Sequence, residues 1–283
     1  MKTQLITRAF LTQLIPERDQ DSYKNQFGHV VLVGGNEQMG GAIQMAARGS
    51  VNAGAGLTTI LSDKSNKTAI HTVLPEAMFM DWNLYFDTLV PHLNKATVIV
   101  IGPGFGLNPT RFDQYMMYLE ETKESKIVVI DADALTQLAK DVDKYAKQLE
   151  KHQVILTPHL GEWQKLSQQQ IADYDDRNIQ HWVEKYDFHL VLKSHQTRIF
   201  IPQTDTILIN TFGNPGMSIG GMGDTLAGIL GGVTAQITHL SSAIPLAVGL
   251  HSLAADKIYE THYVVKPTEV SDYLPKLMNQ LLD

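Results

Sequence analysis

Short apolar runs rich in β-branched residues alternate along this chain with longer segments that have helical spacing. Runs of this kind are typical of strands that are buried on both faces between layers of helices. They occur within residues 29–35, 57–63, 96–106, 126–135, 153–163 and 189–194. Because a helical segment carries the chain from one strand to the next, this order predicts an α/β fold with a mostly parallel sheet covered by helices on both sides.

The later part of the chain predicts a hairpin and then helices. Residues 197–202 and 206–212 are two more β-branched runs with a short connection, which indicates a hairpin at an edge of the sheet. From Gly220 the spacing predicts helical structure to about Thr261, with a break near His239.

Composition and charge exclude several classes of protein. Lys and Arg together number 23 against 30 for Asp and Glu, so the formal charge is −7, which argues against a nucleic-acid-binding protein. There is no cysteine, which rules out disulfides, thiolate zinc sites and cysteine nucleophiles. No window of about 18 uninterrupted apolar residues predicts a membrane span, and we expect a cytoplasmic protein. With no internal repeat and no flexible linker, residues 1–283 are expected to form a single domain.

Polar residues follow the C-terminal ends of several predicted strands. In open α/β sheets, ligands bind outside this edge. The residues concerned are Asn36, Gly104, Asp131, Asp133, His159, Glu162 and Lys193. Loops after strands are often polar without any function, so each residue alone is equally compatible with a solvated loop. Their occurrence at one edge is the stronger indication, and it predicts a ligand site there.

Two glycine-rich turns leave their role open. The run GGNEQMGGA (34–42) has the glycine spacing of a phosphate loop, but Gly41 and Ala42 stand where a Walker loop requires Lys and Ser or Thr. Close packing of a helix on the sheet is therefore as good an explanation as ligand contact. The run GPGFG (102–106) lacks the spacing of a dinucleotide fingerprint, although its glycines would let the backbone approach a ligand.

The most informative segment is GNPGMSIGGMGDTLAGILGG (213–232). Gly220, Gly221 and Gly223 precede Asp224, and apolar residues then recur with helical spacing. A glycine turn that opens a helix presents free N–H groups and the positive end of the helix dipole, which favour an anion. Asp224 is either a simple helix cap or a base that accepts a hydroxyl proton during phosphoryl transfer, in which case the dipole would keep it ionised.

Two other patterns bear on metal binding. Asp131 and Asp133 in DADAL are candidates for holding Mg²⁺ at a phosphate site, and capping of the following helix is an equally good explanation. His159 stands in TPHLGEW, where neither an HExxH motif nor a compact histidine cluster supports a zinc enzyme.

Taken together, these motifs resemble the nucleotide-dependent NAD(P)H-hydrate dehydratases of the ribokinase-like superfamily. The resemblance covers nearly the whole chain. Its residues are Arg18, YKNQFGHVVLVGGN (23–36), GGAIQMAARGSVNAGAGLTT (40–59), GPGFG, VVIDADAL, TPHLGEW, KSHQT (193–197) and GNPGMSIGGMGDTLAG. A ribokinase-like fold would be a three-layer sandwich with a mostly parallel central sheet and helices on both faces.

The resemblance also implies a role for each matched residue. Asp224 would be the base and would contact the substrate, and the turn of Gly220, Gly221 and Gly223 would bind the phosphate anion. The nucleotide, ADP or ATP, would be lined by Lys193, Ser194, His195, Gln196 and Thr197. The hydrated nicotinamide nucleotide would be contacted by Ala42, Gly104, Phe105, Gly106 and His159. The chain departs from the family's usual residues at Leu160, Ser194 and Met222.

The implied reaction is the repair of hydrated NADH or NADPH. The hydroxyl of the hydrate would be phosphorylated by ADP or ATP, with Mg²⁺ at the phosphates, and phosphate would then leave to restore the reduced cofactor. The ADP-using branch is the closer match. Two alternatives are a small-molecule kinase of the same fold, of the hydroxyethylthiazole or pyridoxal type, and a non-catalytic nucleotide-binding regulator.

The resemblance further implies a homotetramer and a separate NAD(P)H-hydrate epimerase as partner enzyme, with no epimerase domain fused to this chain. The N-terminal segment offers weak support for assembly, because its apolar residues would form one stripe on a helix. They are Leu5, Ala9, Leu11, Leu14 and Ile15. Without the resemblance, docking of this stripe on its own domain is the simpler expectation. In a tetramer, the same segment could border a cofactor bound to a neighbouring subunit.

Overall fold

The computed structural model describes residues 1–168 and 175–282, and the strands in these residues form one sheet of ten. The order across the sheet is β1-β10-β9-β8-β7-β6-β5-β2-β3-β4. The bounds are β1 (Lys2–Ile6), β2 (His29–Val33), β3 (Leu57–Ser62), β4 (Met78–Asp81), β5 (Val98–Ile101), β6 (Ile127–Ile130), β7 (Gln153–Leu156), β8 (Phe188–Leu192), β9 (Arg198–Phe200) and β10 (Thr206–Asn210). Among these ten strands, only β9 runs antiparallel to its neighbours, so the expected mostly parallel sheet is confirmed.

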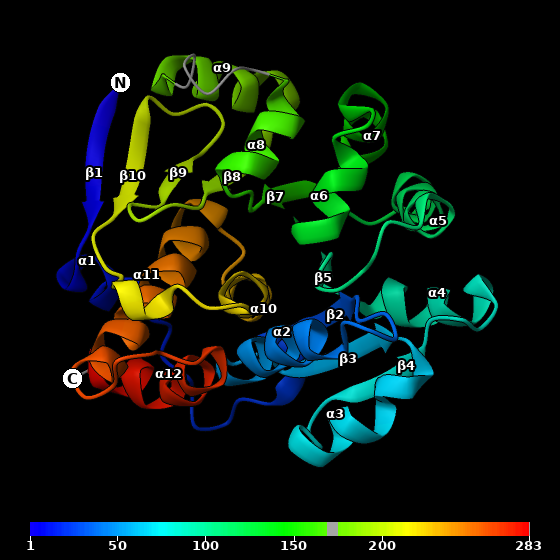
Figure 1. Cartoon of the computed structure of the whole chain (residues 1–283), viewed down its shortest axis with the longest axis horizontal. Helices are drawn as coiled ribbons and strands as arrows, with labels where there is room; N and C mark the ends of the chain where they lie inside the picture. Colours follow the sequence, from blue (N-terminus) through cyan, green and yellow to red (C-terminus); the bar gives the residue numbers. More distant parts are fainter. Residues whose placement is uncertain (169–174, 283) are drawn as a thin grey trace.

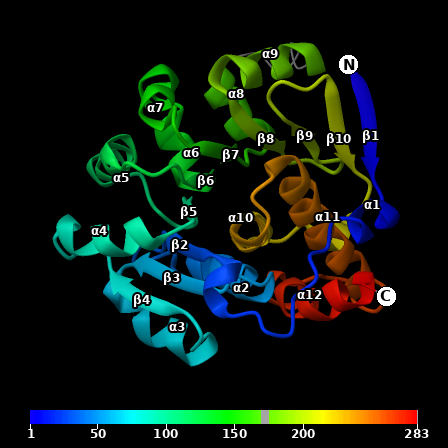
Figure 2. The ribbon, with the colours of Figure 1, turned by 180° about the vertical axis from the view of Figure 1, so that it is seen from behind.

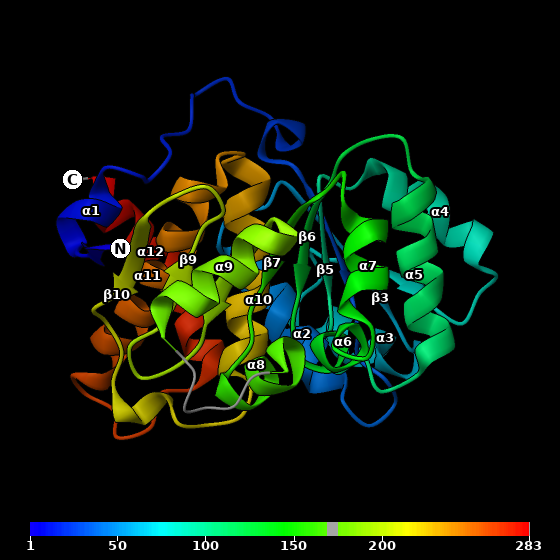
Figure 3. The same ribbon diagram turned by 90° about the horizontal axis from the view of Figure 1, so that it is seen from above.

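Helices cover both faces of the sheet, as Figures 1 and 3 show. On the inner face lie α1 (Arg8–Thr12), α2 (Gly40–Asn52), α3 (Lys67–Val73), α10 (Met222–Gln236), α11 (Leu240–Tyr259) and α12 (Pro267–Leu282). On the outer face lie α4 (Phe86–Lys95), α5 (Pro109–Glu121), α6 (Ala132–Leu138), α7 (Val142–Leu149), α8 (Leu160–Ser167) and α9 (Asp176–Tyr186). The central strands are apolar on both sides because they contribute to both cores: Val30 and Leu32 of β2 face the inner core, and Val31 and Val33 face the outer one.

The structure corrects two details at the β1 end of the sheet. The predicted hairpin forms, but β10 is not the edge strand, because β1 pairs with it in parallel. Residues 2–6 are therefore strand, and no single N-terminal helix carries the predicted apolar stripe. The Thr7 hydroxyl accepts the N–H of Phe10 at 3.3 Å and caps α1 there, so the helix starts only at Arg8. Leu5 is 53% exposed, whereas Leu11 and Ile15 are buried in the inner core of the same chain.

Strand β4 and helix α12 were not predicted either. Strand β4 lies at the opposite edge of the sheet, and α12 packs against α2 and α11 (Figure 2). The predicted break between the two late helices is confirmed, since α10 ends at Gln236 and α11 begins at Leu240. No helix in residues 1–168 or 175–282 is long and apolar enough to cross a membrane.

Helices α2 and α10 approach each other closely through glycine. A Cβ atom on Gly228 would stand 1.8 Å from the backbone carbonyl oxygen of Ala46, and one on Gly49 would stand 2.8 Å from that of Thr225. Backbone on both sides leaves no flexible atom to move aside. This contact fixes α10 against α2 and so sets the position of the glycine turn at the N-terminus of α10.

Replacing Gly228 by Ala is therefore expected to destabilise the fold by about 1–3 kcal/mol or more, because the added methyl group overpacks two helix backbones. Gly41→Ala is the matched control. Beyond its own helix, no described residue comes within 4 Å of a Cβ at this position, so the same change should instead stabilise helix α2 by up to about 1 kcal/mol. Urea unfolding of the two variants measures both effects. Equal midpoints for the two variants would contradict the close approach of α2 and α10.

Candidate active site

The C-terminal ends of β2 and β5 to β8 bring the predicted polar residues together at one edge of the sheet. Asn36 follows β2, Asp131 follows β6 and Lys193 follows β8. The first turn of α10 meets them from the inner face: a Cβ on Gly223 would lie 3.2 Å from Lys193 Nζ and 3.9 Å from Asp131 Oδ2. Gly221 precedes this turn with φ of +98°, a left-handed conformation that suits glycine. The glycine turn thus lies directly at the strand ends.

A buried ion pair forms the centre of the site. Lys193 Nζ lies 2.8 Å from Asp131 Oδ1, and the Thr157 hydroxyl donates to the same oxygen at 2.6 Å. Asp131 is only 1% exposed. Burial alone would lower the pKa of Lys193, but the charges of Asp131 and Glu162 outweigh it and raise that pKa above its ordinary value. Lys193 therefore stays charged at the junction of the strand ends and α10.

Asp224 is the third residue of α10 and faces this pair. Burial, and next the negative charge of Asp131, raise the pKa of Asp224 to about 6, and the charge of Lys193 offsets part of this. The expectation that the helix dipole holds the carboxylate firmly ionised was therefore incomplete, because burial and like charge oppose it. A carboxylate with a pKa near neutrality suits a group that accepts and releases a proton in one catalytic cycle.

Asp131 and Asp133 point to different partners because of the residue between them. Ala132 has φ of +48°, a left-handed conformation that is unfavourable for a residue with a Cβ atom. Asp131 turns to Lys193, while Asp133 Oδ2 accepts the N–H of Gly106 at 2.7 Å. Asp131 occupies the cap position of α6 without making a side-chain cap bond, so the helix-cap alternative fails for it. Among the described residues, no three His, Asp or Glu side chains cluster to hold a metal.

The loops after β2 and β5 are bonded to each other. The N–H of Gly35 donates to Pro103 O at 2.9 Å, and the N–H of Asn36 donates to Gly104 O at 2.7 Å. Ala42 is buried beside Gly104. Phe105 is 1% exposed and packs edge-on against aromatic rings of the outer core, so its side chain lies away from the site. These glycines therefore serve close packing, and only the backbone of residues 104–106 is available to a ligand.

His159 is the N-cap residue of α8, and an isolated parallel bridge joins its backbone to that of Lys193. Its Nδ1 accepts the N–H groups of Gly161 and Glu162 at 3.0 and 3.1 Å, while Glu162 Oε2 accepts the N–H of His159 at 2.8 Å. This reciprocal capping box explains why a histidine stands at the helix start.

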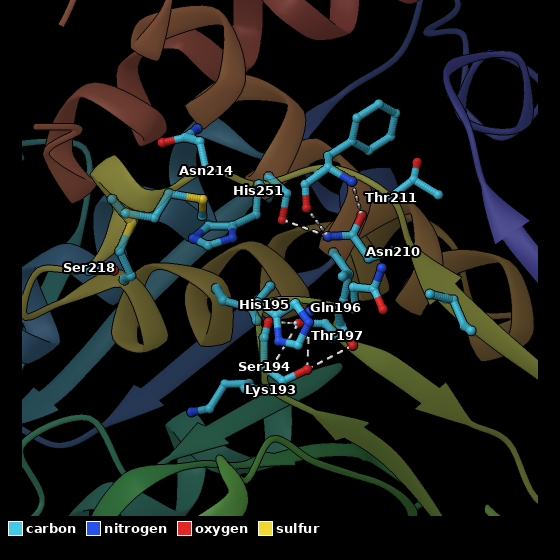
Figure 4. A pocket seen from close by; sticks show the side chains of 18 of the residues that line it. Lys193, Ser194, His195, Gln196, Thr197, Asn210, Thr211, Asn214, Ser218 and His251 are labelled. Atoms are coloured by element: carbon cyan, nitrogen blue, oxygen red, sulfur yellow. Dashed lines mark hydrogen bonds between the residues drawn. The ribbon is translucent and has the colours of Figure 1, made fainter. Parts of the chain in front are cut away.

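A cavity of about 920 Å³ opens beside Lys193 (Figure 4). Residues 193–197 line one side, and Asn214 and His251 lie across from them. All five residues predicted to contact the nucleotide line this cavity, and so does Gly223. The residues predicted to contact the hydrate do not line it. Residues 104–106 follow β5, His159 follows β7 and Ala42 lies on the first turn of α2 after β2, all on the other side of Lys193 in the sheet order. Asp224 lies on α10.

Much of the cavity wall was not predicted from the sequence. It consists of Leu5, Ile209, Asn210, Thr211, Phe212, Gly213, Asn214, Pro215, Met217, Ser218, Met222, Leu226, Val248, His251 and Ser252. One signal was present: His251 and Ser252 interrupt the apolar run of residues 243–255. Inside the fold Ser252 accepts a hydrogen bond from Asn210 at 2.9 Å. Burial lowers the pKa of His251 to about 4, so its ring is neutral. Leu5, from the N-terminal segment, borders the cavity of its own chain.

Comparisons with known proteins agree with this geometry. A family model described as NAD(P)H-hydrate dehydratase matches residues 30–276. An ADP-dependent (S)-NAD(P)H-hydrate dehydratase of Enterococcus faecalis is 40% identical over 277 residues, covering 97% of this chain and 92% of that protein.

Solved structures give the same result. A ribokinase-like superfamily protein from Enterococcus faecalis superposes with a TM-score of 0.91 at 40% identity, covering 99% of this chain and 96% of that one. An ADP/ATP-dependent NAD(P)H-hydrate dehydratase from Bacillus subtilis, co-crystallised with ATP and Mg²⁺, superposes with a TM-score of 0.84 at 26% identity and 98% coverage of both chains. The predicted ribokinase-like fold is thereby confirmed, and the chain belongs to the NAD(P)H-hydrate dehydratase family.

Proposed function

We propose that this protein dehydrates hydrated NADH and NADPH with ADP as the phosphoryl donor and so restores the reduced cofactor. The observation that carries the proposal is the position of Asp224. Its carboxylate, with a pKa raised to about 6, lies on the first turn of α10, where the neighbouring Gly223 lines the nucleotide-sized cavity, and the strand-end carboxylates Asp131 and Asp133 act on it. A base placed beside a nucleotide cavity at the strand ends suits transfer of a group from one ligand to another.

The first step forms a phosphate ester. Asp224 takes the proton of the hydrate's hydroxyl group as that oxygen attacks the β-phosphorus of ADP, and AMP leaves. Lys193 supplies a positive charge at the edge of the cavity, and the N–H groups at the start of α10 stabilise the negative charge on the transferring phosphoryl group.

The second step restores the ring. The electron pair of the ring nitrogen expels phosphate from the carbon that carried the hydroxyl, and loss of a proton from the neighbouring carbon completes the double bond. Phosphate is a far better leaving group than hydroxide, which is the chemical reason for consuming a nucleotide. The products are AMP, phosphate and the reduced cofactor.

Magnesium fits this site as an ion carried on the nucleotide. A Mg²⁺ bound to phosphates needs only one or two carboxylates from the protein. Of Asp131, Asp133 and Asp224, only Asp131 forms a salt bridge within the described residues, to Lys193. Asp133 would therefore hold the ion, which would neutralise part of the phosphate charge when bound, and Asp224 would remain available as the base.

The test is to incubate the protein with NADH hydrate and ADP and to follow the absorbance of the dihydronicotinamide ring. The proposal expects absorbance to return only when nucleotide is present. A small-molecule kinase would instead accumulate a stable phosphorylated product, and a non-catalytic regulator would bind ADP without consuming it. Either outcome would replace the proposal. Running ADP and ATP in parallel decides the preferred donor.

The pH dependence of the rate provides a check on Asp224 as base. Only the ionised carboxylate accepts a proton, so kcat should fall by about tenfold for each pH unit below the pKa of Asp224. With that pKa at about 6, the acid limb should lie near pH 6 rather than near pH 4. Measuring kcat between about pH 5 and 8 locates it. A rate that stays constant down to pH 5 would mean that another group is the base.

We also propose a homotetramer that works with a separate NAD(P)H-hydrate epimerase in the cytoplasm. Strand β1 supports assembly, because it is an edge strand of the sheet. One side of its backbone has no strand partner among the described residues, and four of its five residues are exposed. Light scattering at micromolar concentration is expected to give four times the mass of one chain. The mass of a single chain, unchanged by ADP, would contradict the tetramer.

A further inference from the structure

Glu162 lies beside His159, which follows β7, and Lys193, which follows β8. Its side chain is 14% exposed, and one of its oxygens, Oε2, lies near three groups. It accepts the backbone N–H of His159 at 2.8 Å, and it lies 3.6 Å from His159 Nε2 and 4.0 Å from Lys193 Nζ. A carboxylate that served only as a helix cap would need the first of these contacts and no other.

The capping box determines which nitrogen of His159 carries the proton. Nδ1 accepts two backbone N–H groups, so it cannot hold a proton, and the neutral ring must carry its hydrogen on Nε2. The distance of 3.6 Å from Nε2 to Glu162 is too long for a hydrogen bond. Because the side chain of His159 is 60% exposed, the Nε2–H group is free to donate to a ligand. His159 is therefore built as a hydrogen-bond donor and not as a base.

Lys193 is held next to His159 by backbone as well as by charge. The N–H of Lys193 donates to Pro158 O at 2.8 Å, continuing the pairing of β7 and β8 beyond their ends. On the cavity side Lys193 lines the wall beside residues 194–197. Glu162 thus bonds to the backbone of His159, whose ring donor is exposed, and it lies near Lys193, a cation that lines the cavity.

We propose that Glu162 is a positioning residue that orients His159 as an Nε2–H donor toward the hydrate and Lys193 as the cation toward the nucleotide. The inference rests on the proposed function, since it names those two ligands. His159 would bind the hydrate and Lys193 would bind the nucleotide. A single carboxylate that holds both side chains therefore fixes the position of the attacking hydroxyl relative to the transferred phosphoryl group. A displacement of about 1 Å between two such groups can cost about a hundredfold in rate.

Glu162→Gln separates positioning from capping. Glutamine keeps an acceptor for the N–H of His159, as in natural capping boxes, so the melting temperature should stay at the wild-type value. The lost charge should lower kcat/KM by about tenfold or more, with KM raised for both ADP and the hydrate. Glu162→Ala removes the acceptor as well, and it should lower the melting temperature in addition to the activity.

The pH profile gives a readout that a purely structural role would not move. The charged groups that act on Asp224 are Asp131, Lys193, Asp133 and Glu162, contributed by α6, α8 and the end of β8. Removing the negative charge of Glu162 lowers the pKa of Asp224, so the acid limb of kcat in Glu162→Gln should move to lower pH.

Two further variants complete the set. His159→Asn keeps a helix-capping side chain but loses the Nε2–H donor, so KM should rise for the hydrate and not for ADP. Asp141→Asn is the matched control. The Asp141 carboxylate also caps a helix, because it accepts the N–H of Lys144 at 3.1 Å, but it is not among the groups that shift the pKa of Asp224. This control should leave kinetics and pH profile at wild-type values.

The outcomes separate this inference from the proposed function. If the wild type restores the cofactor but Glu162→Gln has wild-type KM values and an unmoved acid limb, then Glu162 only caps α8 and the inference is wrong. If the wild type does not restore the cofactor, the proposed function fails. In that case the role of Glu162 is still tested by direct titration of the wild type and of Glu162→Gln with ADP and with NADH hydrate. Weaker binding of both ligands to the variant supports positioning, and binding equal to that of the wild type overturns it.

Discussion

Replacing Asp224 by Asn is expected to abolish turnover and, at the same time, to make the protein more stable at neutral pH. Asparagine has nearly the same shape but cannot accept the hydroxyl proton, and loss of a general base costs about 10²–10⁴ in rate. Nucleotide binding should persist, because the cavity wall that residues 193–197 form is unchanged.

The gain in stability follows from the raised pKa. The folded protein holds a proton on Asp224 more tightly than the unfolded chain, whose value is the ordinary 3.8 against about 6 in the fold. The stabilising contribution of this group is therefore complete at low pH and is lost as the pH rises from about 4 to 6. At neutral pH the ionised carboxylate costs the fold about 3 kcal/mol, which Asp224→Asn removes.

Urea unfolding at pH 7 and at pH 4 measures this effect. The variant should gain stability over the wild type at pH 7 and show little gain at pH 4, where the wild-type carboxyl is already largely protonated in the fold. A variant that turns over at the wild-type rate would remove Asp224 from the mechanism. A variant that is less stable than the wild type at pH 7 would show that the carboxylate is not destabilised by its surroundings.

Replacing Lys193 by Met should produce the largest loss of stability among these variants. Methionine fills the space of the stem but leaves the Asp131 carboxylate, which is 1% exposed, without its partner at 2.8 Å. Breaking a buried ion pair by removing one member costs about 3–5 kcal/mol. ADP binding should weaken as well, because the cation at the edge of the cavity is lost.

Two comparisons make this result interpretable. Adding Asp131→Asn to Lys193→Met removes the buried, unpaired negative charge of Asp131. The double variant should therefore recover much of the stability without recovering ADP binding. Lys2→Met breaks the pair with Asp205, whose members are both exposed and 3.5 Å apart, and it should cost less than about 1 kcal/mol. Losses of the same size for Lys2→Met and Lys193→Met would contradict the burial of the central pair.

The sequence was sufficient to predict the positions of the strand ends and of the glycine turn. Runs that are apolar on both faces identify buried parallel strands, and polar residues placed directly after them, such as Asp131 and Lys193, must meet at one edge of the sheet. The helix after Asp224 was also predictable from its spacing. These features depend on local pattern, which the sequence carries directly.

Features that depend on contacts between distant segments could not be predicted. Strand β1 forms because β10 offers an open edge, which no pattern in residues 2–6 announces. The pKa of Asp224 depends on how far α10 is buried and on the charge of Asp131, a residue on another element. The ring of Phe105 fills the outer core beside Trp82, so the predicted substrate contact of this residue is left to its backbone. Pattern alone does not distinguish an aromatic residue beside a ligand from one in a core.

The central claim is that one site couples phosphoryl transfer from ADP to loss of the hydroxyl group from a hydrated nicotinamide nucleotide. The most direct test is the stoichiometry of a single reaction that contains the protein, NADH hydrate, ADP and Mg²⁺. AMP, phosphate and restored NADH are expected to appear in equal amounts and with the same time course. Restoration of NADH without AMP, or AMP formation with a phosphorylated hydrate that accumulates and releases no phosphate, would contradict the claim.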